Sequence, residues 1–277
     1  MNKYSKSTIK RILKHYVLKV FRITSEKTWY SCFLEEEVIK KYLQQMALKN
    51  NFVVDIGASD GVTMSNTYFL YRNNWRGAAI EFTDEKFTKL SIIYKNSPNV
   101  NLLKVKATPD NVRYLLKSCF TPLDFSLLSL DIDSYDYYVL DAILVEYRPS
   151  LICVEINEKI PPPIKFTVFY DPNHIWAKDH FYGQSISQLY SLCKKYEYDL
   201  VELHYCNAFL IPKEINKNKP LTPEEAYDKG YRYKVDRKKK FPWNSDMESV
   251  LEMPPEKTVE FIKEKFGKYE GRYLIKY

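Results

Sequence analysis

Residues 126–140 read SLLSLDIDSYDYYVL, an apolar run that ends abruptly in Asp131, Asp133 and Asp136. Carboxylates placed this close together repel one another, and charge at the end of a buried strand is costly to desolvate. Two interpretations are open at this point. Either Asp133 or Ser134 caps the next helix and the other two aspartates are solvated, or a cation or a transferable proton lies above the strand.

Strands and helices alternate on both sides of this stretch. Apolar runs predict buried strands at residues 52–56, 77–81, 100–105, 125–132 and 150–156. Helical spacing of apolar residues predicts helices at 33–48, 64–74, 84–94, 110–118, 134–145 and 184–196. Residues 198–205 and 207–212 predict a closing strand pair without a helix between them. This order indicates an α/β fold with βαβ units, a mostly parallel sheet and one antiparallel strand.

Composition bounds the class of protein. The chain has 277 residues, 45% of them hydrophobic, and no apolar run reaches the roughly 18 residues that span a bilayer. The basic N-terminus lacks the apolar stretch and cleavage site of a secretory signal. The five cysteines form no C-x-x-C pair, which predicts free thiols in a reducing, cytoplasmic setting. The net charge of +7 fits nucleic acid, an anionic membrane or an acidic substrate, but biased codon usage is the favoured explanation.

The chain divides into three predicted parts: an N-terminal helical segment at 1–48, a main domain at 49–212 and a C-terminal extension at 213–277 that packs on that domain. Within the first part, residues 7–23 form an amphipathic pattern. This pattern predicts peripheral membrane or partner contact, or a helix packed on the domain or on a second subunit of a homo-oligomer; packing is favoured. Residues 213–254 are rich in Pro, Lys and Tyr and predict a surface extension.

Two glycines follow the first strand in VVDIGASDGVTMSNT, residues 53–67. The pattern D-x-G-x-x-x-G lacks the tight turn that cradles a dinucleotide, and no P-loop lysine follows. Asp55 disfavours a phosphate and suits a cationic ligand. Glu81 ends the second strand, where a carboxylate can accept hydrogen bonds from both hydroxyls of a ribose. Together these features predict a site for S-adenosylmethionine.

Several segments resemble class I methyltransferases, and among them the FkbM-like group. The resembling segments are DIGASDGVTMSNTYFL (55–70), WRGAAIE (75–81), ATPDNV (107–112), LLSLDIDSYDYYVLDAI (127–143), RPSLICVEIN (148–157), YGQSISQLYSLCKKYEYDLV (182–201) and NAFLI (207–211). The resemblance implies a Rossmann-like, seven-stranded sheet with helices on both faces and S-adenosylmethionine over its carboxyl edge. The cofactor contacts that we expect are Asp55, Gly57, Ala58, Ser59, Gly61, Asn66, Thr67, Glu81, Asp131 and, in the adenine pocket, Ala107 and Thr108.

A metal site is also predicted at this edge. Asp131 and Asp133 follow the fourth strand, and Glu155 and Asn157 end its neighbour. Carboxylate and amide oxygens are the ligands that Mg²⁺ and Mn²⁺ prefer. In the metal-free alternative, Asp133 or Asp136 is the general base for a hydroxyl acceptor.

The loop at 156–185 is longer than a plain connection and is typical of a binding segment. It carries His174 and His180, either of which is a candidate base or an ordinary loop residue. Its aromatic and charged residues suit a carbohydrate or another polar acceptor. The basic run KVDRKKK at 234–240 indicates a solvated face more than a nucleic-acid site.

The sequence as a whole predicts an S-adenosylmethionine-dependent O-methyltransferase that acts on a sugar hydroxyl of a glycan or glycoconjugate, assisted by a divalent metal or by a carboxylate or histidine base. The alternatives are a methyltransferase for another small molecule or for nucleic acid, and a scaffold protein that binds the cofactor without turnover.

Overall fold

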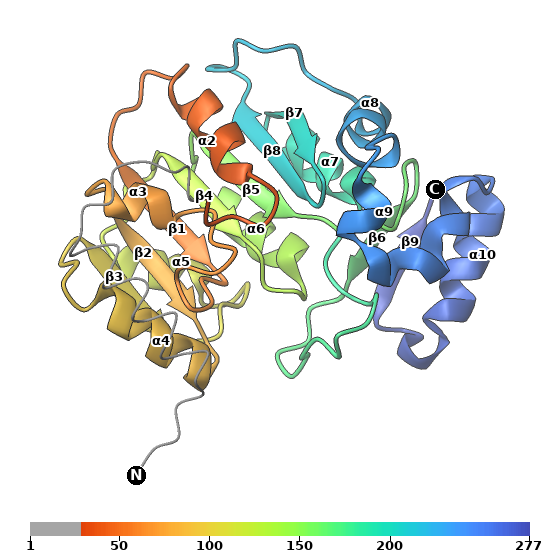
Figure 1. Cartoon of the computed structure of the whole chain (residues 1–277), viewed down its shortest axis with the longest axis horizontal. Coiled ribbons are helices and arrows are strands. Elements are labelled where there is room, and N and C mark those ends of the chain that lie inside the picture. The colour runs from red at the N-terminus through yellow and green to blue at the C-terminus, as the bar shows by residue number, and fades with distance from the viewer. Residues whose placement is uncertain (1–28) are drawn as a thin grey trace.

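A single large sheet organises the chain. The computed structural model describes residues 29–277, and the helix predicted at 7–23 lies outside them (Figure 1). Within the described residues the sheet has seven strands in the order β3-β2-β1-β4-β5-β8-β7. The strands are β1 (Phe52–Ile56), β2 (Arg76–Glu81), β3 (Val100–Lys104), β4 (Leu127–Leu130), β5 (Leu151–Glu155), β7 (Tyr198–His204) and β8 (Asn207–Pro212). Neighbours from β3 to β5 are parallel, and β8 is antiparallel to β5 and β7. The predicted Rossmann-like α/β fold is confirmed.

Helices cover both faces of the sheet because both faces are apolar. Along β1, Val54 and Ile56 belong to one buried cluster and Val53 to another, as the alternation of side chains in a strand requires. The first cluster packs under α5 (Val112–Ser118), α6 (Asp136–Leu144) and α7 (Ile186–Lys195). The second packs under α2 (Glu35–Leu43), α3 (Tyr68–Arg72) and α4 (Asp84–Tyr94).

A second, small sheet was not predicted. It pairs β6 (Lys165–Val168), inside the long loop, with β9 (Tyr273–Lys276) near the end of the chain. A separate apolar cluster that includes Phe166, Phe181 and Ile262 lies under this pair. A strand of four residues whose partner is far away in the sequence gives no local signal, which explains why the pattern was missed.

The C-terminal extension packs into the main core with its first part and against the small sheet with its last helix. Its elements are α8 (Pro223–Tyr227), the π-helix η1 (Asp228–Arg232), α9 (Arg237–Lys240), the 3₁₀-helix η2 (Pro242–Leu251), α10 (Pro255–Lys265), η3 (Gly267–Tyr269) and β9. Tyr227 and Tyr231 are fully buried in the same cluster as the sheet. Most of residues 213–254 lie at the surface, as expected, and Tyr233 is exposed, while Tyr227 and Tyr231 anchor the segment in the core.

Two expectations from composition can be compared with the structure. All five cysteines lie among the described residues and are free thiols, as predicted. Among residues 29–277, no helix combines the length and the apolar character that crossing a bilayer requires.

Gly230 provides a test of how the extension is attached to the sheet. A Cβ atom at Gly230 would lie 2.1 Å from the backbone oxygen of Leu203 in β7, whereas one at Gly267 would meet nothing within 4 Å. We expect Gly230→Ala to lower the free energy of unfolding by about 2 kcal/mol or more through overpacking. Urea denaturation measures this, with Gly267→Ala as the matched control. Equal stability of the two variants would contradict the packing described.

Candidate active site at the carboxyl edge of the sheet

The ends of four parallel strands bring the predicted site residues to one edge of the sheet. Asp55 is the next-to-last residue of β1, and Glu81 and Glu155 are the last residues of β2 and β5. Asp131 directly follows β4, which lies between β1 and β5. Ligands of open α/β sheets bind at this edge, so the fold places the candidate residues where chemistry is expected.

The turn after β1 depends on a close backbone approach. Gly57 has a φ of 91°, and a Cβ atom there would lie 1.7 Å from the backbone oxygen of Asp131. No side chain fits at this position, so glycine is required. The backbone N–H groups of Gly57 and Ala58 both donate to the carbonyl of Ile80 at 3.0 Å. Gly61, with a φ of 77°, is packed against Leu90 by the same logic. The turn is thereby fixed to β2 and β4.

Glu81 connects this turn with the start of α4. Its side chain is buried, and its two carboxylate oxygens accept hydrogen bonds from the backbone N–H of Ser59 at 3.0 Å and of Thr83 at 2.7 Å. Each carboxylate oxygen has two lone pairs, so capacity for further hydroxyl donors is left. Glu81 therefore lies beside the glycine turn, at the position that the sequence predicts.

Asp55 has hydrogen-bond partners within the protein. It is buried, and Thr67 donates its hydroxyl to Oδ2 at 2.6 Å. Burial raises the pKa of Asp55 to about 6, although hydrogen bonds from Thr67 and Ser129 oppose that rise. The neighbouring Asn66 donates its amide to the sulfur of Cys153 at 3.7 Å. Both Thr67 and Asn66 therefore tie the glycine-rich segment to the strands, and a direct contact of Asp55 with a ligand stays a prediction.

Asp131, Asp133 and Glu155 form an acidic cluster. One carboxylate oxygen from each lies within 4.8 Å of those of the other two, and Asp131 is exposed while the others are half-buried. Asp133 has a φ of 53° in the turn that follows β4. Among the described residues, the carboxylate of Asp133 forms no ion pair, although the charges of Lys86 and Lys159 act on it from farther away. The cluster brings together three of the four predicted metal ligands.

The pKa values of the cluster reflect this crowding. Burial and the neighbouring Asp133 and Asp136 raise the pKa of Asp131 well above its usual range. Although its side chain reaches solvent, surrounding protein excludes enough bulk water to disfavour the charged form. Burial and Asp131 likewise raise the pKa of Glu155, and burial and Asp136 raise that of Asp133 to about 6. The three groups cannot all ionise cheaply without a cation.

Asp136 holds the turn in place. It is 1% exposed, and its two oxygens accept the backbone N–H groups of Ile132 at 2.9 Å and Ser134 at 3.0 Å. Burial raises its pKa. The capping interpretation is wrong, because α6 has Tyr135 at its N-cap without a side-chain cap, and Asp136 accepts from backbone N–H groups that precede the helix. Its action as a base stays a prediction, with both oxygens already in use.

Asn157, the fourth predicted ligand, has a defined orientation. It is fully buried, and its Nδ2 donates to the carbonyls of His180 at 2.9 Å and Tyr182 at 3.0 Å. Because the amide nitrogen has two acceptors, the amide cannot flip. Its Oδ1 has no hydrogen-bond partner among the described residues. An unpaired buried acceptor is costly, so this oxygen is suited to a bound cation or donor.

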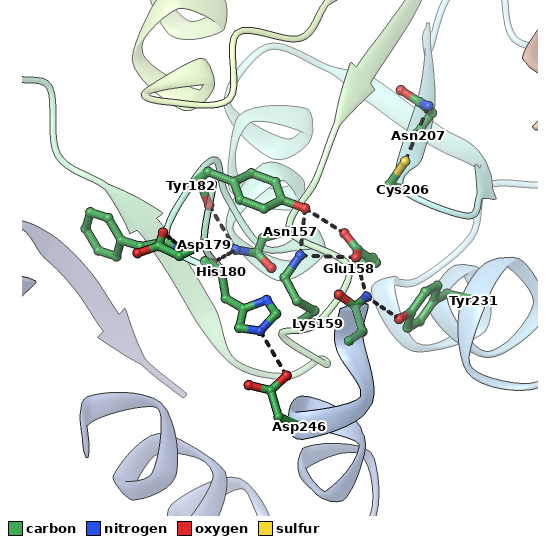
Figure 2. A network of polar contacts seen from close by, with 12 residues as sticks. Asn157, Glu158, Lys159, Asp179, His180, Tyr182, Cys206, Asn207, Tyr231 and Asp246 are labelled. Atoms are coloured by element: carbon green, nitrogen blue, oxygen red, sulfur yellow. Dashed lines mark hydrogen bonds and ion pairs between the residues drawn. The ribbon is translucent and has the colours of Figure 1, made fainter. Parts of the chain in front are cut away.

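The two candidate histidines have different surroundings. His174 is buried with an unpaired Nε2, and its carbonyl accepts from Nζ of Lys106 at 2.7 Å. His180 has its Nε2 3.0 Å from Oδ1 of Asp246 in η2 (Figure 2). Burial lowers the pKa of both rings. The pairing of His180 with the C-terminal extension was not predicted.

The segment after β3 is joined to the long loop. Tyr135 donates its hydroxyl to the carbonyl of Ala107 at 3.3 Å, and the Thr108 backbone N–H donates to Asn111 at 2.8 Å. Lys106 donates to the carbonyls of Pro172 and His174. Sequence reasoning missed Lys106, because a lysine at a strand end gives no signal of its distant partners.

Three of the five basic residues in the run at 234–240 form ion pairs. Arg237 and Lys238 pair with Glu248, and Lys240 pairs with Asp236. These ion pairs agree with the preference for a solvated face.

Comparison with known proteins finds solved structures of similar fold but does not show a family for this chain. No protein-family model and no curated protein matches the sequence. The chain is similar to a SAM-dependent methyltransferase from Aquifex aeolicus (14% identity, covering 76% of this chain and 97% of that one, TM-score 0.38). It is similar to the O-methyltransferase from Bacillus cereus in complex with SAH (12%, 75% and 90%, 0.44). It is also similar to the N-terminal domain of EvdMO1 in the presence of SAH and D-fucose (8%, 76% and 99%, 0.43). These overlaps are low, and the fold assignment rests on the strand order and directions of this chain.

Asp55 makes stability depend on pH. Its native pKa of about 6 lies above its ordinary value of 3.8, so the folded state binds the extra proton and loses stability as pH rises from about 4 to about 6. In Asp55→Asn this loss is absent. We expect the variant to gain up to about 3 kcal/mol relative to wild type between pH 4 and pH 7. Urea denaturation across that range measures the difference.

Thr67→Val is the companion variant. It removes a hydroxyl that lowers the pKa of Asp55, so its stability should fall more steeply with pH than that of wild type. A difference between wild type and Asp55→Asn that does not change with pH would show that Asp55 is ionised normally.

Proposed function

We propose that this protein is an S-adenosylmethionine-dependent class I O-methyltransferase, related to the FkbM-like group, that acts on a hydroxyl of a carbohydrate or similarly polar acceptor. One observation carries the proposal: a glycine turn, a buried ribose-type carboxylate and an acidic cluster meet at one edge of the sheet. A cytoplasmic location and a homo-oligomeric state stay predictions alongside it.

The cofactor is assigned to the β1–β2 side of the edge. Glu81 has acceptor capacity left for two ribose hydroxyls, and its bonds to Ser59 and Thr83 keep it in place. S-adenosylmethionine carries a positive sulfonium and an ammonium group, so a negatively charged edge suits it. Asp131 is the exposed carboxylate beside the glycine turn and is assigned to these charges. Ala107 and Thr108 are assigned to the adenine end.

The acceptor hydroxyl needs activation, because it is a poor nucleophile at neutral pH. The donor set of Asp131, Asp133, Glu155 and the unpaired Oδ1 of Asn157 fits a hard divalent cation such as Mg²⁺ or Mn²⁺. When bound, such an ion lowers the pKa of an oxygen ligand. The chain's own part is to orient the acceptor and to keep the turn at Asp133 rigid through Asp136.

A metal-free route uses the same residues. Asp133 has a pKa of about 6 and is therefore largely ionised at neutral pH, where it can take the proton of the acceptor hydroxyl. The carbon–sulfur bond of the cofactor breaks as the new carbon–oxygen bond forms, and S-adenosylhomocysteine leaves. His174, with its unpaired Nε2, is the second base that this route considers, and His180 is the third.

Glu81→Gln tests the cofactor assignment. Loss of charge-assisted hydrogen bonds to the ribose should weaken S-adenosylmethionine binding roughly 10- to 100-fold, as measured by calorimetry. Glu85→Gln, on the exposed side of α4, is the matched control and should bind as wild type does. Equal affinities in all three proteins would remove Glu81 from the cofactor site. Absence of binding in wild type would sink the proposed function, and binding without turnover over a panel of sugar acceptors would favour the scaffold alternative.

Asp133→Asn tests the metal. We expect Mg²⁺ or Mn²⁺ to raise the melting temperature of wild type by a few degrees, because the ion binds the native state. The variant should lose most of that shift. In EDTA at neutral pH it should instead melt higher than wild type, since one crowded charge is gone. A wild-type melting temperature that is indifferent to both ions would favour the metal-free route.

A further inference from the structure

A buried ion pair lies just beyond the acidic cluster, and the proposed chemistry does not use it. Glu158 and Lys159 follow Glu155 in the sequence and are 1% and 3% exposed. Nζ of Lys159 lies 3.1 Å from Oε1 of Glu158. Figure 2 shows this pair at the centre of a polar network. Among the ion pairs of the described residues, no other has both side chains this deeply buried.

Three separate parts of the chain meet at this pair. From the long loop, the hydroxyl of Tyr182 accepts from Lys159 at 2.7 Å and donates to Oε2 of Glu158 at 2.9 Å. From the C-terminal extension, Asn244 donates to Oε1 of Glu158 at 2.6 Å, and Tyr227 donates to the backbone carbonyl of Glu158. The pair therefore joins the end of β5, the long loop and the extension.

Stability alone does not account for charges at this place. Burial by itself raises the pKa of Glu158, but Lys159 and Asn244 outweigh it and hold that pKa below its usual range. A carboxylate is thus kept ionised in the interior. Replacing a buried ion pair by neutral groups of similar volume is often neutral or stabilising. The pair instead orients its neighbours, because each of its hydrogen bonds fixes the position of the partner side chain.

The partner that the pair fixes lies next to the candidate active site. The backbone carbonyl of Tyr182 accepts from Nδ2 of Asn157, which orients the unpaired Oδ1. The backbone N–H of the next residue, Gly183, donates to the carbonyl of Ser134 at 2.8 Å. Ser134 directly follows Asp133 in the turn. A shift of Tyr182 would therefore move both Asn157 and the turn at Asp133.

We propose that Lys159 is a positioning residue for the acceptor side of the site. Its ammonium, paired with Glu158, holds Tyr182 so that residues 180–184 keep Asn157 and the Asp133 turn in register beside the acidic cluster. The C-terminal extension takes part through Asn244. This proposal rests on the proposed function for the meaning of the site, but the geometry it asserts can be measured without any acceptor.

The test compares Lys159→Met with the double variant Glu158→Gln plus Lys159→Met. The single variant leaves a buried carboxylate unpaired and should melt well below wild type. The double variant removes both charges at similar volume and should melt within a few degrees of wild type. Hydrogen exchange of the Gly183 amide is measured in each. We expect exchange at least about tenfold faster than wild type in both variants, because both lose the hold on Tyr182.

The comparison of melting temperature with Gly183 exchange in the double variant decides the question. If the pair were only structural, the stable double variant would exchange Gly183 as slowly as wild type, and that result would overturn the proposal. The matched control is Lys117→Met plus Glu146→Gln, a surface ion pair outside the network, which should leave Gly183 unchanged. If the double variant does not fold, Tyr182→Phe removes only the bridging hydroxyl; faster Gly183 exchange supports the proposal and unchanged exchange overturns it.

Cofactor calorimetry on the same proteins separates this proposal from the proposed function. Fast exchange at Gly183 with wild-type cofactor affinity supports both. If the variants exchange Gly183 fast but the wild-type protein binds no S-adenosylmethionine, the positioning role is supported and the proposed function is contradicted.

Discussion

The contact between Gly57 and the main chain of Asp131 is the constraint on which the site depends. The ends of β1 and β4 come so close that a Cβ atom at position 57 would overlap the backbone oxygen of Asp131. This approach fixes the glycine turn against the strand that carries the acidic cluster. Glu81 is drawn into the same arrangement through Ser59. The glycine turn and the acidic cluster are neighbours because the ends of β1 and β4 pack together without a side chain between them.

Electrostatics then divides the site into two unlike halves. In the acidic cluster, burial and then the neighbouring carboxylates raise the pKa values of all three groups. A short distance along the chain, Glu158 has a buried ammonium beside it and its pKa falls. The first half is prepared for a cation or a proton from outside, whereas in the second half each charge has a partner of opposite sign. An unpaired set of charges is typical of binding, and a paired set is typical of positioning.

The sequence predicted the parts of the fold that depend on local pattern. The strands of the main sheet, the glycine turn and the carboxylates at strand ends follow from alternation and spacing over a few residues, and the structure places Asp131, Asp133 and Glu155 together. It did not predict partners far apart in the chain. The pairing of β6 with β9, the contact of His180 with Asp246 and the network around Lys159 each join distant segments. Short strands and single polar residues carry no periodic signal, so these contacts appear only once the chain is folded.

The pairing of β6 with β9 also has a consequence for biosynthesis. A ribosome makes the chain from its N-terminus, and domains tend to fold as their residues emerge. The strands that carry the glycine turn and the acidic cluster are all made before β6, but β6 must wait for its partner until β9 has been made. The nascent chain therefore passes through a stage in which the carboxyl edge of the sheet can be assembled while Phe166 and Phe181 lack the cover of α10. During translation, this stage leaves apolar surface exposed, and such surface favours aggregation until the last strand has been made.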